Sequence, residues 1–487
     1  MKKLNKFLIL SLLSFAVLFY GCEDRSDLTA PVVKTGNADF SRFVVVGNSL
    51  SAGYQNGTLY ESSQKYSFGK LIADQVGAKY EQPIISDPGT GGRLEISGFN
   101  ADGTPNIVRN PNKGAPTNLN YSAPYNNLGI PGEWLPDALS ATDSNSCITG
   151  QAGSPNPYFN LVLRGIGTQM RQALMQHPTF IIFWLGNNDI LAHAATGGVA
   201  PYTPEATFEL VYNMAMDSLA TDSTAKVVVA NIPYVTSTPY FTTIGPKVGL
   251  AIKPLVDDSL VIDDSLLVGG LYYQKSIDVG AVPVTQFATP KDLIAGNVIL
   301  TLAGSQFAGM IGDTTGLSAA YYQSIGIDPT AVGVDVTKPF GLHPQNPFPN
   351  PYTLDGDELA NIKSVIDSYN ATIQAAAESH GFALVDINTF FNGVASSGYI
   401  SNGITFTSAY ISGNTFALDG VHPTTRGYGI IANQFIMEIN KAFNAQIPLV
   451  DVATLPNSIL LKGFYPQKGI VNGFPHIDPS IQYKVQF

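Results

Sequence analysis

The feature that most constrains the fold is a set of short apolar runs rich in β-branched and aromatic residues. Four of them stand out: "FVVV" at 43–46, "TFIIFWL" at 179–185, "KVVVA" at 226–230 and "FALVDI" at 382–387. Short runs without polar alternation are typical of strands buried on both faces, as in parallel sheets. A weaker fifth candidate is "KYEQPII" at 79–85.

Amphipathic helical patterns lie between these runs. One apolar stripe recurs at helical spacing and is followed by Gly381, a residue suited to end a helix: Leu359, Ile362, Ile366, Tyr369, Ile373. A second stripe runs from Tyr428 to Phe443. Short buried strands alternating with such helices predict a mainly parallel sheet covered by helices on both faces.

Two long segments interrupt this alternation and are interpreted as insertions, near 86–126 and 234–351. The second is too long for a structureless loop, and Thr289, Pro290 and Asp292 predict a capped helix within it. We expect it to form a lid at the carboxyl edge of the sheet, although a remote decoration would also fit. Residues 446–487 are expected to form an irregular C-terminal extension.

Within that second insertion, "VDDSLVIDDSLL" at 256–267 carries two pairs of aspartates. Calcium binding is one interpretation, but the segment lacks the Gly and Glu spacing of an EF-hand loop. A solvated hairpin is favoured.

The N-terminus is typical of an export signal rather than of the fold. A basic start, "MKKLNK", precedes the apolar "FLILSLLSFAVLFYG", and Cys22 follows at once. This resembles a bacterial lipoprotein signal over residues 1–21, with Cys22 as the lipidated residue and 22–40 as a tether. Phe19 stands where the usual motif has leucine, and an uncleaved signal anchor is the alternative. The expected location is a bacterial membrane surface, with the outer membrane or cell surface favoured.

Charge and cysteine content narrow the expected partners. The formal charge is −11, and removal of the signal with its three lysines would make it −14. Such an acidic chain repels phosphates, so we expect no nucleic-acid partner. With Cys22 lipidated, Cys147 has no second cysteine for an internal disulfide. We expect no cofactor, and no Cys/His cluster indicates a metal site.

Ser49 directly follows the first apolar run, in "GNSL". Open α/β sheets bind ligands at the carboxyl ends of their strands, so Ser49 is a candidate nucleophile there, although a turn residue is the simpler interpretation. A nucleophilic serine needs a base and an acid that orients the base. Among the six histidines, His422 alone has an acidic residue three positions earlier, Asp419 in "DGVH". His343 and His380 lack that local acid.

Oxyanion stabilisation needs preorganised donors, and two positions qualify. Asn188 follows the second apolar run in "GNND", and Gly132 lies in the turn of "NNLGIPGEW". Each motif alone is common in loops that have no catalytic role.

Taken in order, these motifs resemble the SGNH/GDSL hydrolase family, which is named for its Ser, Gly, Asn and His. "GNSL", "NLGIPG", "GNND" and "DGVH" resemble its conserved blocks, over about half the chain. The resemblance implies a flavodoxin-like three-layer α/β/α sandwich, here expected over 41–445. It also implies an acyl-enzyme esterase with Ser49, Asp419 and His422 as the triad. Ser49, Gly132 and Asn188 would then form the oxyanion hole.

One departure is Asn48, where the family has aspartate; this affects local geometry more than the chemistry. The signature Gly-x-Ser-x-Gly of α/β-hydrolases is absent from the sequence. The substrate stays open among lipid, acetyl-glycan and small acyl esters. A non-catalytic surface lipoprotein that binds glycan or lipid on the same fold is the alternative function.

Overall fold

The computed structural model describes residues 33–100, 104–221, 224–254, 262–263, 266–267, 269–275 and 284–456. The predicted signal at 1–21, Cys22 and most of the tether lie outside the described residues. So do Asp257, Asp258, Asp264 and residues 457–487. The chain divides into the compact units Met1–Lys34 and Thr35–Phe487, and the fold below is that of the second unit.

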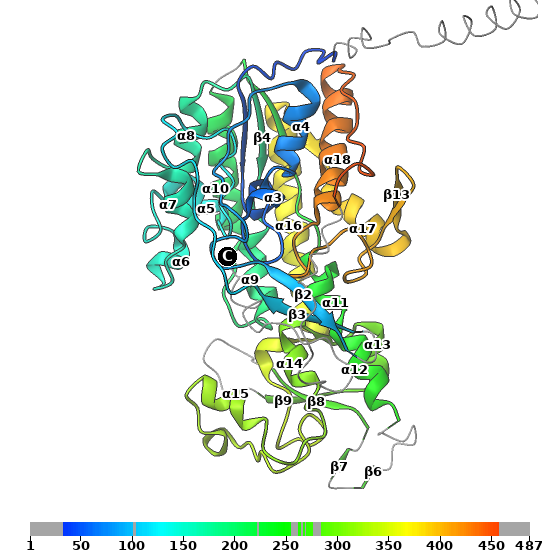
Figure 1. The fold of residues 1–487 in the computed structure, drawn as a ribbon. Coiled ribbons are helices and arrows are strands. Elements are labelled where there is room, and N and C mark those ends of the chain that lie inside the picture. Colours follow the sequence, from blue (N-terminus) through cyan, green and yellow to red (C-terminus); the bar gives the residue numbers. More distant parts are fainter. Residues whose placement is uncertain are drawn as a thin grey trace, which may run out of the picture. The chain divides into compact units, whose positions relative to one another are not determined.

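A four-stranded parallel sheet forms the centre of the fold (Figure 1). Its order is β1-β4-β5-β12, and the strands span Phe43–Gly47, Phe180–Trp184, Lys226–Ala230 and Ala383–Val385. Gly47 pairs with Trp184 and Phe183 with Val229, so the carboxyl ends of these strands lie at the same edge. The four apolar runs therefore form strands, and the predicted parallel sheet is confirmed.

The fifth strand candidate, 79–85, was wrong. Only Ile85 of that segment makes a bridge, antiparallel to Pro116. Residues 126–130 run beside β1 instead, with parallel bridges from Asn127 to Val45 and from Ile130 to Asn48. This placement brings the "NLGIPG" turn to the same sheet edge as Ser49.

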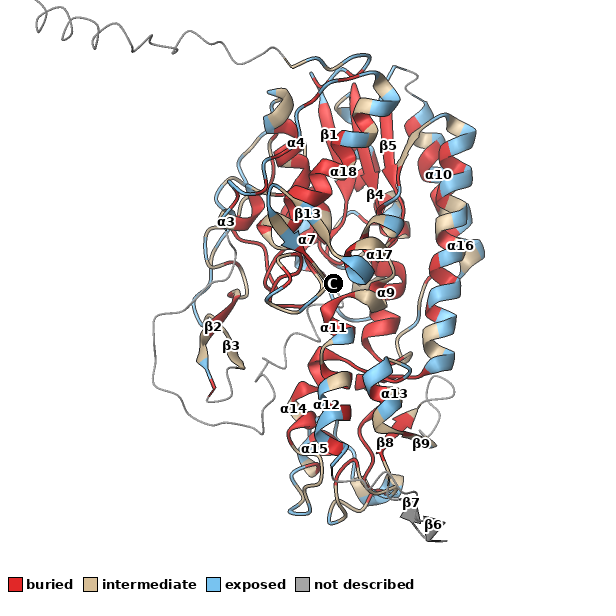
Figure 2. Cartoon of the chain, turned by 90° about the vertical axis from the view of Figure 1, so that its right-hand side faces the viewer, coloured by how far each residue is buried: buried red, intermediate tan, exposed pale blue. Residues whose placement is uncertain are grey.

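Helices cover both faces of the sheet, which gives the three-layer α/β/α sandwich (Figures 1 and 2). On one face α4 and α18 pack together; on the other lie α5, α8, α10 and α16. Their bounds are Phe68–Val76, Thr425–Phe443, Leu135–Ser140, Gln169–Met175, Glu205–Ala220 and Gly356–His380. As predicted, α16 ends before Gly381, which takes a left-handed conformation at φ 66°.

Aromatic rings fill the two interfaces between the sheet and its helices. Phe68 of α4 stacks on Phe435 of α18 at 4.8 Å between centroids and contacts Trp184 of β4 edge-on. On the opposite face Phe208 and Tyr369 stack at 3.8 Å. Burying a side chain of this size contributes about 1.5–3 kcal/mol, so these rings anchor the helices that carry the sheet edge.

The segment 234–351 leaves the frame after β5 and returns before α16. Its helices are η2 Val235–Ser237, α11 Pro239–Thr242, α12 Ile244–Ile252, α13 Pro290–Ala295, η3 Leu302–Gly304, α14 Ser305–Ala308, α15 Ala319–Ser324, η4 Pro329–Val332 and η5 Asn350–Tyr352. Its strands are β6 Ile262–Asp263, β7 Leu266–Leu267, β8 Leu271–Lys275, β9 Val284–Ala288 and β10 Ile299–Leu300, which pairs with β11 Thr353–Leu354.

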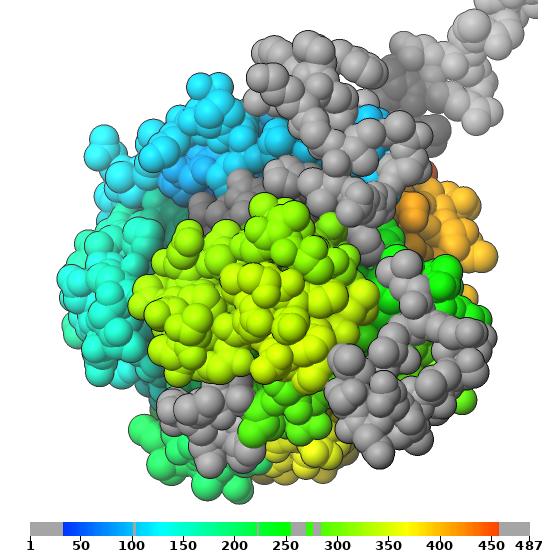
Figure 3. All heavy atoms as spheres, turned by 90° about the horizontal axis from the view of Figure 1, so that it is seen from below, coloured from blue at the N-terminus to red at the C-terminus, as the bar shows by residue number. Residues whose placement is uncertain are grey.

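The capped helix predicted within this segment is confirmed, because Thr289 and Asp292 form a capping box at the start of α13. In the aspartate-rich segment, β6 pairs antiparallel with β7. Phe307 contacts Phe340, Phe348 and Tyr352, and these rings belong to the same continuous apolar core as the sheet. Seen from below, it occupies the front of the molecule (Figure 3).

The remaining elements are short. They comprise α2 Ser49–Ala52, α3 Glu61–Gln64, β2 Leu94–Phe99, β3 Pro105–Arg109, α6 Ile148–Gln151, α7 Pro157–Leu163, α9 Asn188–Ala195, α17 Ile387–Ser397, β13 Tyr399–Ser401 and β14 Ile404–Phe406. The strands β2 and β3 form a hairpin, as do β13 and β14. Within the described part of the chain, no helix combines the length and apolarity needed to cross a bilayer.

Candidate active site

Ser49 begins the one-turn helix α2 directly after β1. The preceding Asn48 caps this helix, because its side-chain oxygen accepts a hydrogen bond from Leu50 N at 3.1 Å. Asparagine and aspartate cap helices equally well. Asn48 therefore fulfils a local structural role for which a negative charge is not required. Ser49 itself is 4% exposed.

His422 lies beside Ser49 at the sheet edge, although 373 positions separate them in the chain. The distance from His422 Nε2 to Ser49 Oγ is 2.9 Å. On the other side of the ring, Nδ1 lies 3.3 Å from Asp419 Oδ2. That contact is close, but it is not aligned well enough to count as a hydrogen bond. The structure thus brings together the three residues predicted to form the triad.

Backbone N–H groups fix the carboxylate of Asp419. Its Oδ1 accepts from His422 N at 2.8 Å and from Val421 N at 3.0 Å, and its Oδ2 accepts from Gly57 N at 2.9 Å. Burial alone would raise the pKa of Asp419, but the charge of His422 and the N–H groups of Val421 and His422 outweigh it and hold the pKa below its usual value. A carboxylate that stays ionised beside the ring can stabilise an imidazolium.

The turn between Asp419 and His422 also contacts the root of the 234–351 segment. Gly420 adopts φ +75°, and its carbonyl oxygen accepts a hydrogen bond from Tyr240 N at 2.9 Å. Tyr54 packs its ring 4.5 Å from the imidazole of His422. The orientation of His422 therefore depends on two distant parts of the chain.

The other described histidines lie away from this arrangement. His193 Nδ1 contacts Ala200 O, and His343 Nδ1 accepts from Gln345 N. His380, at the end of α16, pairs through Nε2 with Asp217 at 3.0 Å. This second Asp–His pair comes from residues far apart in the sequence, so the local pattern could not indicate it. His476 lies outside the described residues.

The predicted oxyanion donors follow the segment 126–130 and β4, at the sheet edge where Ser49 follows β1. Gly132 is buried in a turn with φ +78°, a conformation that favours glycine. Asn188 is the first residue of α9 and is 4% exposed; its Nδ2 donates to Glu133 O at 2.9 Å. A side-chain amide carries two N–H groups, so one donor of Asn188 remains after this contact.

Two buried acids hold the loop that carries Gly132. Asp189 accepts from Leu135 N at 2.9 Å and from Thr203 Oγ1 at 2.7 Å, and burial raises its pKa to about 7. The carboxyl group of Glu133 contacts Gln169 Nε2, and burial raises the pKa of Glu133 well above its usual range. Sequence reasoning missed Glu133, because nothing in its local pattern marks a buried acid.

Gln169 connects this loop to the first strand. Its Nε2 donates to Gly47 O at 2.8 Å and to Leu128 O at 2.7 Å. Gly47 ends β1 immediately before the Asn48–Ser49 turn, so Gln169 fixes the spacing between the nucleophile and the "NLGIPG" turn. Sequence reasoning gave no signal for this residue.

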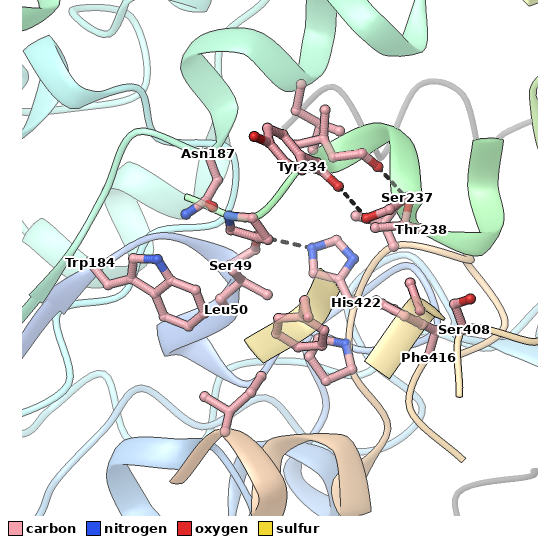
Figure 4. Close-up of a pocket in the computed structure, with 18 residues that line it drawn as sticks. Ser49, Leu50, Trp184, Asn187, Tyr234, Ser237, Thr238, Ser408, Phe416 and His422 are labelled. Atoms are coloured by element: carbon pink, nitrogen blue, oxygen red, sulfur yellow. Dashed lines mark hydrogen bonds between the residues drawn. The ribbon is translucent and has the colours of Figure 1, made fainter. Parts of the chain in front are cut away.

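A pocket opens beside Ser49 and His422 (Figure 4). Its walls come from the ends of β4 and β5, from α9, α17 and α18, and from the loop at 407–423. The lining side chains away from Ser49 and His422 are mainly apolar and carry no formal charge: Leu50, Trp184, Asn187, Leu191, Pro233, Tyr234, Val235, Ser237, Thr238, Phe391, Ala395, Ser408, Phe416, Val421, Pro423, Ile431. Asn188 is absent from this lining, whereas Asn187 is part of it.

Residues 233–238, at the root of the 234–351 segment, form part of this wall. This contact is local: the residues that line the pocket from that segment all lie before α11. Among the residues that the structure places, no group of three or more His, Cys, Asp and Glu side chains could hold a metal ion.

The fold and this geometry define an α/β/α protein with a Ser–His–Asp arrangement at the carboxyl edge of its parallel sheet. Residues 315–435 match the family model of the GDSL-like Lipase/Acylhydrolase family, which confirms the resemblance inferred from the motifs. The match includes Asp419 and His422 and begins within the 234–351 segment. No curated protein matches the chain significantly. At the level of the family, the match supports a hydrolase of ester substrates.

Proposed function

We propose that this protein hydrolyses carboxylic esters through an acyl-enzyme formed on Ser49. The observation that carries the proposal is the aligned contact between Ser49 Oγ and His422 Nε2 at 2.9 Å, with Asp419 behind the ring. A base within this distance of a serine hydroxyl can take its proton as the hydroxyl attacks. The family match points to the same class of substrate.

In the first half of the reaction, Ser49 Oγ adds to the ester carbonyl carbon and its proton moves to His422 Nε2. Asp419 stabilises the imidazolium. The carbonyl oxygen becomes an oxyanion, which the N–H groups of Ser49 and Gly132 and the amide of Asn188 stabilise. Each such donor contributes about 3 kcal/mol to the transition state. The C–O bond then breaks, and the alcohol leaves with the proton from His422.

In the second half, water gives a proton to His422 Nε2 and its oxygen adds to the acyl carbon. The bond to Ser49 Oγ breaks, Ser49 recovers the proton, and the carboxylic acid leaves. Every bond and proton in the two halves of the reaction is accounted for without a cofactor. His422 serves as base and then as acid in each half.

The size of the pocket favours a short acyl group. The cavity beside Ser49 measures about 60 Å³. A single water-sized group needs about 10–15 Å³ of such space, so a pocket of this volume holds only a few such groups. A neighbouring hollow of about 670 Å³ shares Ala395 and Ser408 with it. We place the acyl part in the narrow pocket and the alcohol part toward the wider hollow.

Hydrolysis of p-nitrophenyl acetate, butyrate and octanoate by the purified protein tests the proposal. We expect turnover of the two short esters, with octanoate slower, and loss of all activity in Ser49→Ala. His422→Asn should lower kcat by several orders of magnitude, whereas His343→Asn, at a half-buried histidine outside the pocket lining, serves as the control. Equal turnover by wild type and Ser49→Ala would refute the role of Ser49. Absence of turnover would favour the non-catalytic alternative.

We also propose that the protein is a lipoprotein anchored through Cys22. The support is Cys22 directly behind an apolar run and ahead of the acidic Glu23 and Asp24. Metabolic labelling with a clickable fatty acid should mark the wild-type protein, and Cys22→Ser should abolish the label, with Cys147→Ser as the matched control. Absence of label on the wild type would contradict this proposal without affecting the first.

A further inference from the structure

Asn187 stands at the start of α9, where an asparagine side chain normally caps the helix. Here it makes no such hydrogen bond: the helix begins with the backbone alone, since Asn187 O accepts from Leu191 N at 3.1 Å. Asn187 is itself helical, at φ −64° and ψ −41°. Helix capping therefore does not account for this side chain.

The side-chain amide of Asn187 is buried without a partner. The residue is 6% exposed, and neither Oδ1 nor Nδ2 has a hydrogen-bond partner among the described residues. A buried polar group left unsatisfied costs about 1–3 kcal/mol. Figure 4 places the residue at the pocket that also contains Ser49 and His422. The unused hydrogen-bonding capacity of Asn187 thus lies where a substrate would bind.

The surrounding pocket offers this amide little else to bind. Tyr234, Ser237 and Thr238 also line it, but their hydroxyl groups already donate to Asp367, to Tyr234 O and to Val235 O. Most of the remaining lining is apolar, with Trp184 and Leu191 among it. Asn187 therefore offers free donor and acceptor capacity in a mainly apolar pocket.

We propose that Asn187 is a specificity-determining residue that binds a hydroxyl group on the acyl part of a short hydroxyacyl ester. The inference rests on the proposed ester hydrolysis. A hydroxyl can donate to Oδ1 or accept from Nδ2, whereas a carbonyl can only accept. A charged acyl substituent does not fit, because the lining contains no lysine, arginine, aspartate or glutamate to pair with it.

Matched pairs of esters with the same alcohol test this residue: p-nitrophenyl butyrate against 3-hydroxybutyrate, and propionate against lactate. We expect the wild type to prefer the hydroxylated ester of at least one pair by about tenfold in kcat/KM. Asn187→Leu should reverse that preference and raise kcat/KM for the unsubstituted ester, since an unpaired amide is replaced by an apolar group. An unchanged ratio in Asn187→Leu would overturn the proposal.

Leu191→Met is the matched control, because it alters an apolar wall of the same pocket without changing its polarity. It should shift both members of a pair by the same factor. Thermal melts of Asn187→Leu should lie at or above the wild type, because the side chain makes no capping bond and the change removes an unsatisfied buried amide. The ester 2-hydroxyethyl butyrate carries its hydroxyl on the alcohol part instead of the acyl part. If Asn187→Leu changes the preference for this ester over ethyl butyrate, the proposal that Asn187 binds a hydroxyl of the acyl part is wrong.

A binding experiment separates this proposal from the proposed function. Ser49→Ala removes the nucleophile, so ethyl 3-hydroxybutyrate, ethyl lactate and their deoxy counterparts can be titrated calorimetrically without turnover. Tighter binding of a hydroxylated ester, lost in Ser49→Ala/Asn187→Leu, would support the role of Asn187 even if the wild type hydrolysed nothing. Equal binding of hydroxylated and deoxy esters would refute it even if hydrolysis were established.

Discussion

Gly420 is the position at which one added methyl group should affect both stability and catalysis. It lies between Asp419 and His422 at φ +75°, and a Cβ there would meet Tyr240 N at 3.0 Å, Leu302 Cδ2 at 3.0 Å and Tyr240 Cα at 3.2 Å. The left-handed conformation costs a non-glycine residue about 1–2 kcal/mol. Displacement of Tyr240 also puts its hydrogen bond to Gly420 O at risk, worth about 1 kcal/mol. Gly420→Ala should therefore lower the free energy of unfolding by about 2–3 kcal/mol.

Gly403→Ala isolates the conformational part of that cost. Gly403 has φ +76°, and a Cβ there would meet no atom within 4 Å. Gly403→Ala should lower the free energy of unfolding by about 1–2 kcal/mol and keep full activity. Gly420→Ala should also lower kcat about tenfold, because a small shift of the His422 turn misaligns the base. Urea denaturation and ester hydrolysis on both variants test this. Equal losses of stability together with unchanged kcat in Gly420→Ala would refute the reasoning.

Three further predictions concern the acids and the cysteine. Asp189 has a raised pKa of about 7 against an ordinary 3.8, so it stabilises the fold fully below pH 4 and that contribution is lost as pH rises to about 7. Asp189→Asn should therefore lose less stability than the wild type between pH 4.5 and 7.5 in urea melts, by about 3 kcal/mol at 1.36 kcal/mol per pKa unit; parallel losses would contradict this. Asp419→Asn should lower kcat about 10⁴-fold with little change in KM, as expected when the imidazole loses its orienting acid; a loss below tenfold would count against the triad. Cys147 Sγ accepts from Gly150 N and contacts Ser144 O, each at 3.3 Å. Cys147→Ser should thus retain stability while Cys147→Ala loses about 1 kcal/mol, and equal melting temperatures would argue against that capping role.

The sheet was predictable because its four strands are buried on both faces and therefore nearly continuous in apolar residues. The strand-like segment at the edge of the sheet, beside β1, was not predictable. Residues 126–130 are held beside β1 partly by amide chemistry: Asn126 Nδ2 donates to Phe43 O at 2.9 Å, and Val45 N donates to Asn126 O at 2.8 Å. Hydrophobic patterning gives no signal for such an edge, which explains why 79–85 was preferred.

The site was predictable where its chemistry is local in sequence. Asp419 and His422 are three residues apart, so one turn of chain nearly determines their contact. Ser49 and His422 were linked only through the order of motifs, and the structure supplies the 2.9 Å distance. Adjacent asparagines show the limit of this approach, because a motif cannot tell that Asn188 turns to Glu133 O while Asn187 turns to the pocket.

The two sides of Ser49 are built from different parts of the chain. The Gly132 turn, Glu133, Gln169 and Asn188 are joined to one another and to β1 by hydrogen bonds. The pocket side is formed largely by residues 233–238, α17 and the 407–423 loop. Substitutions in this second group can therefore change which ester fits while the first group keeps its geometry. The separation is incomplete at Gly420, where Tyr240 N donates to the carbonyl oxygen of the turn that carries His422. Removal of the whole 234–351 segment would for that reason disturb the base as well as the pocket, so its influence on substrate choice is better measured by single substitutions in the pocket wall.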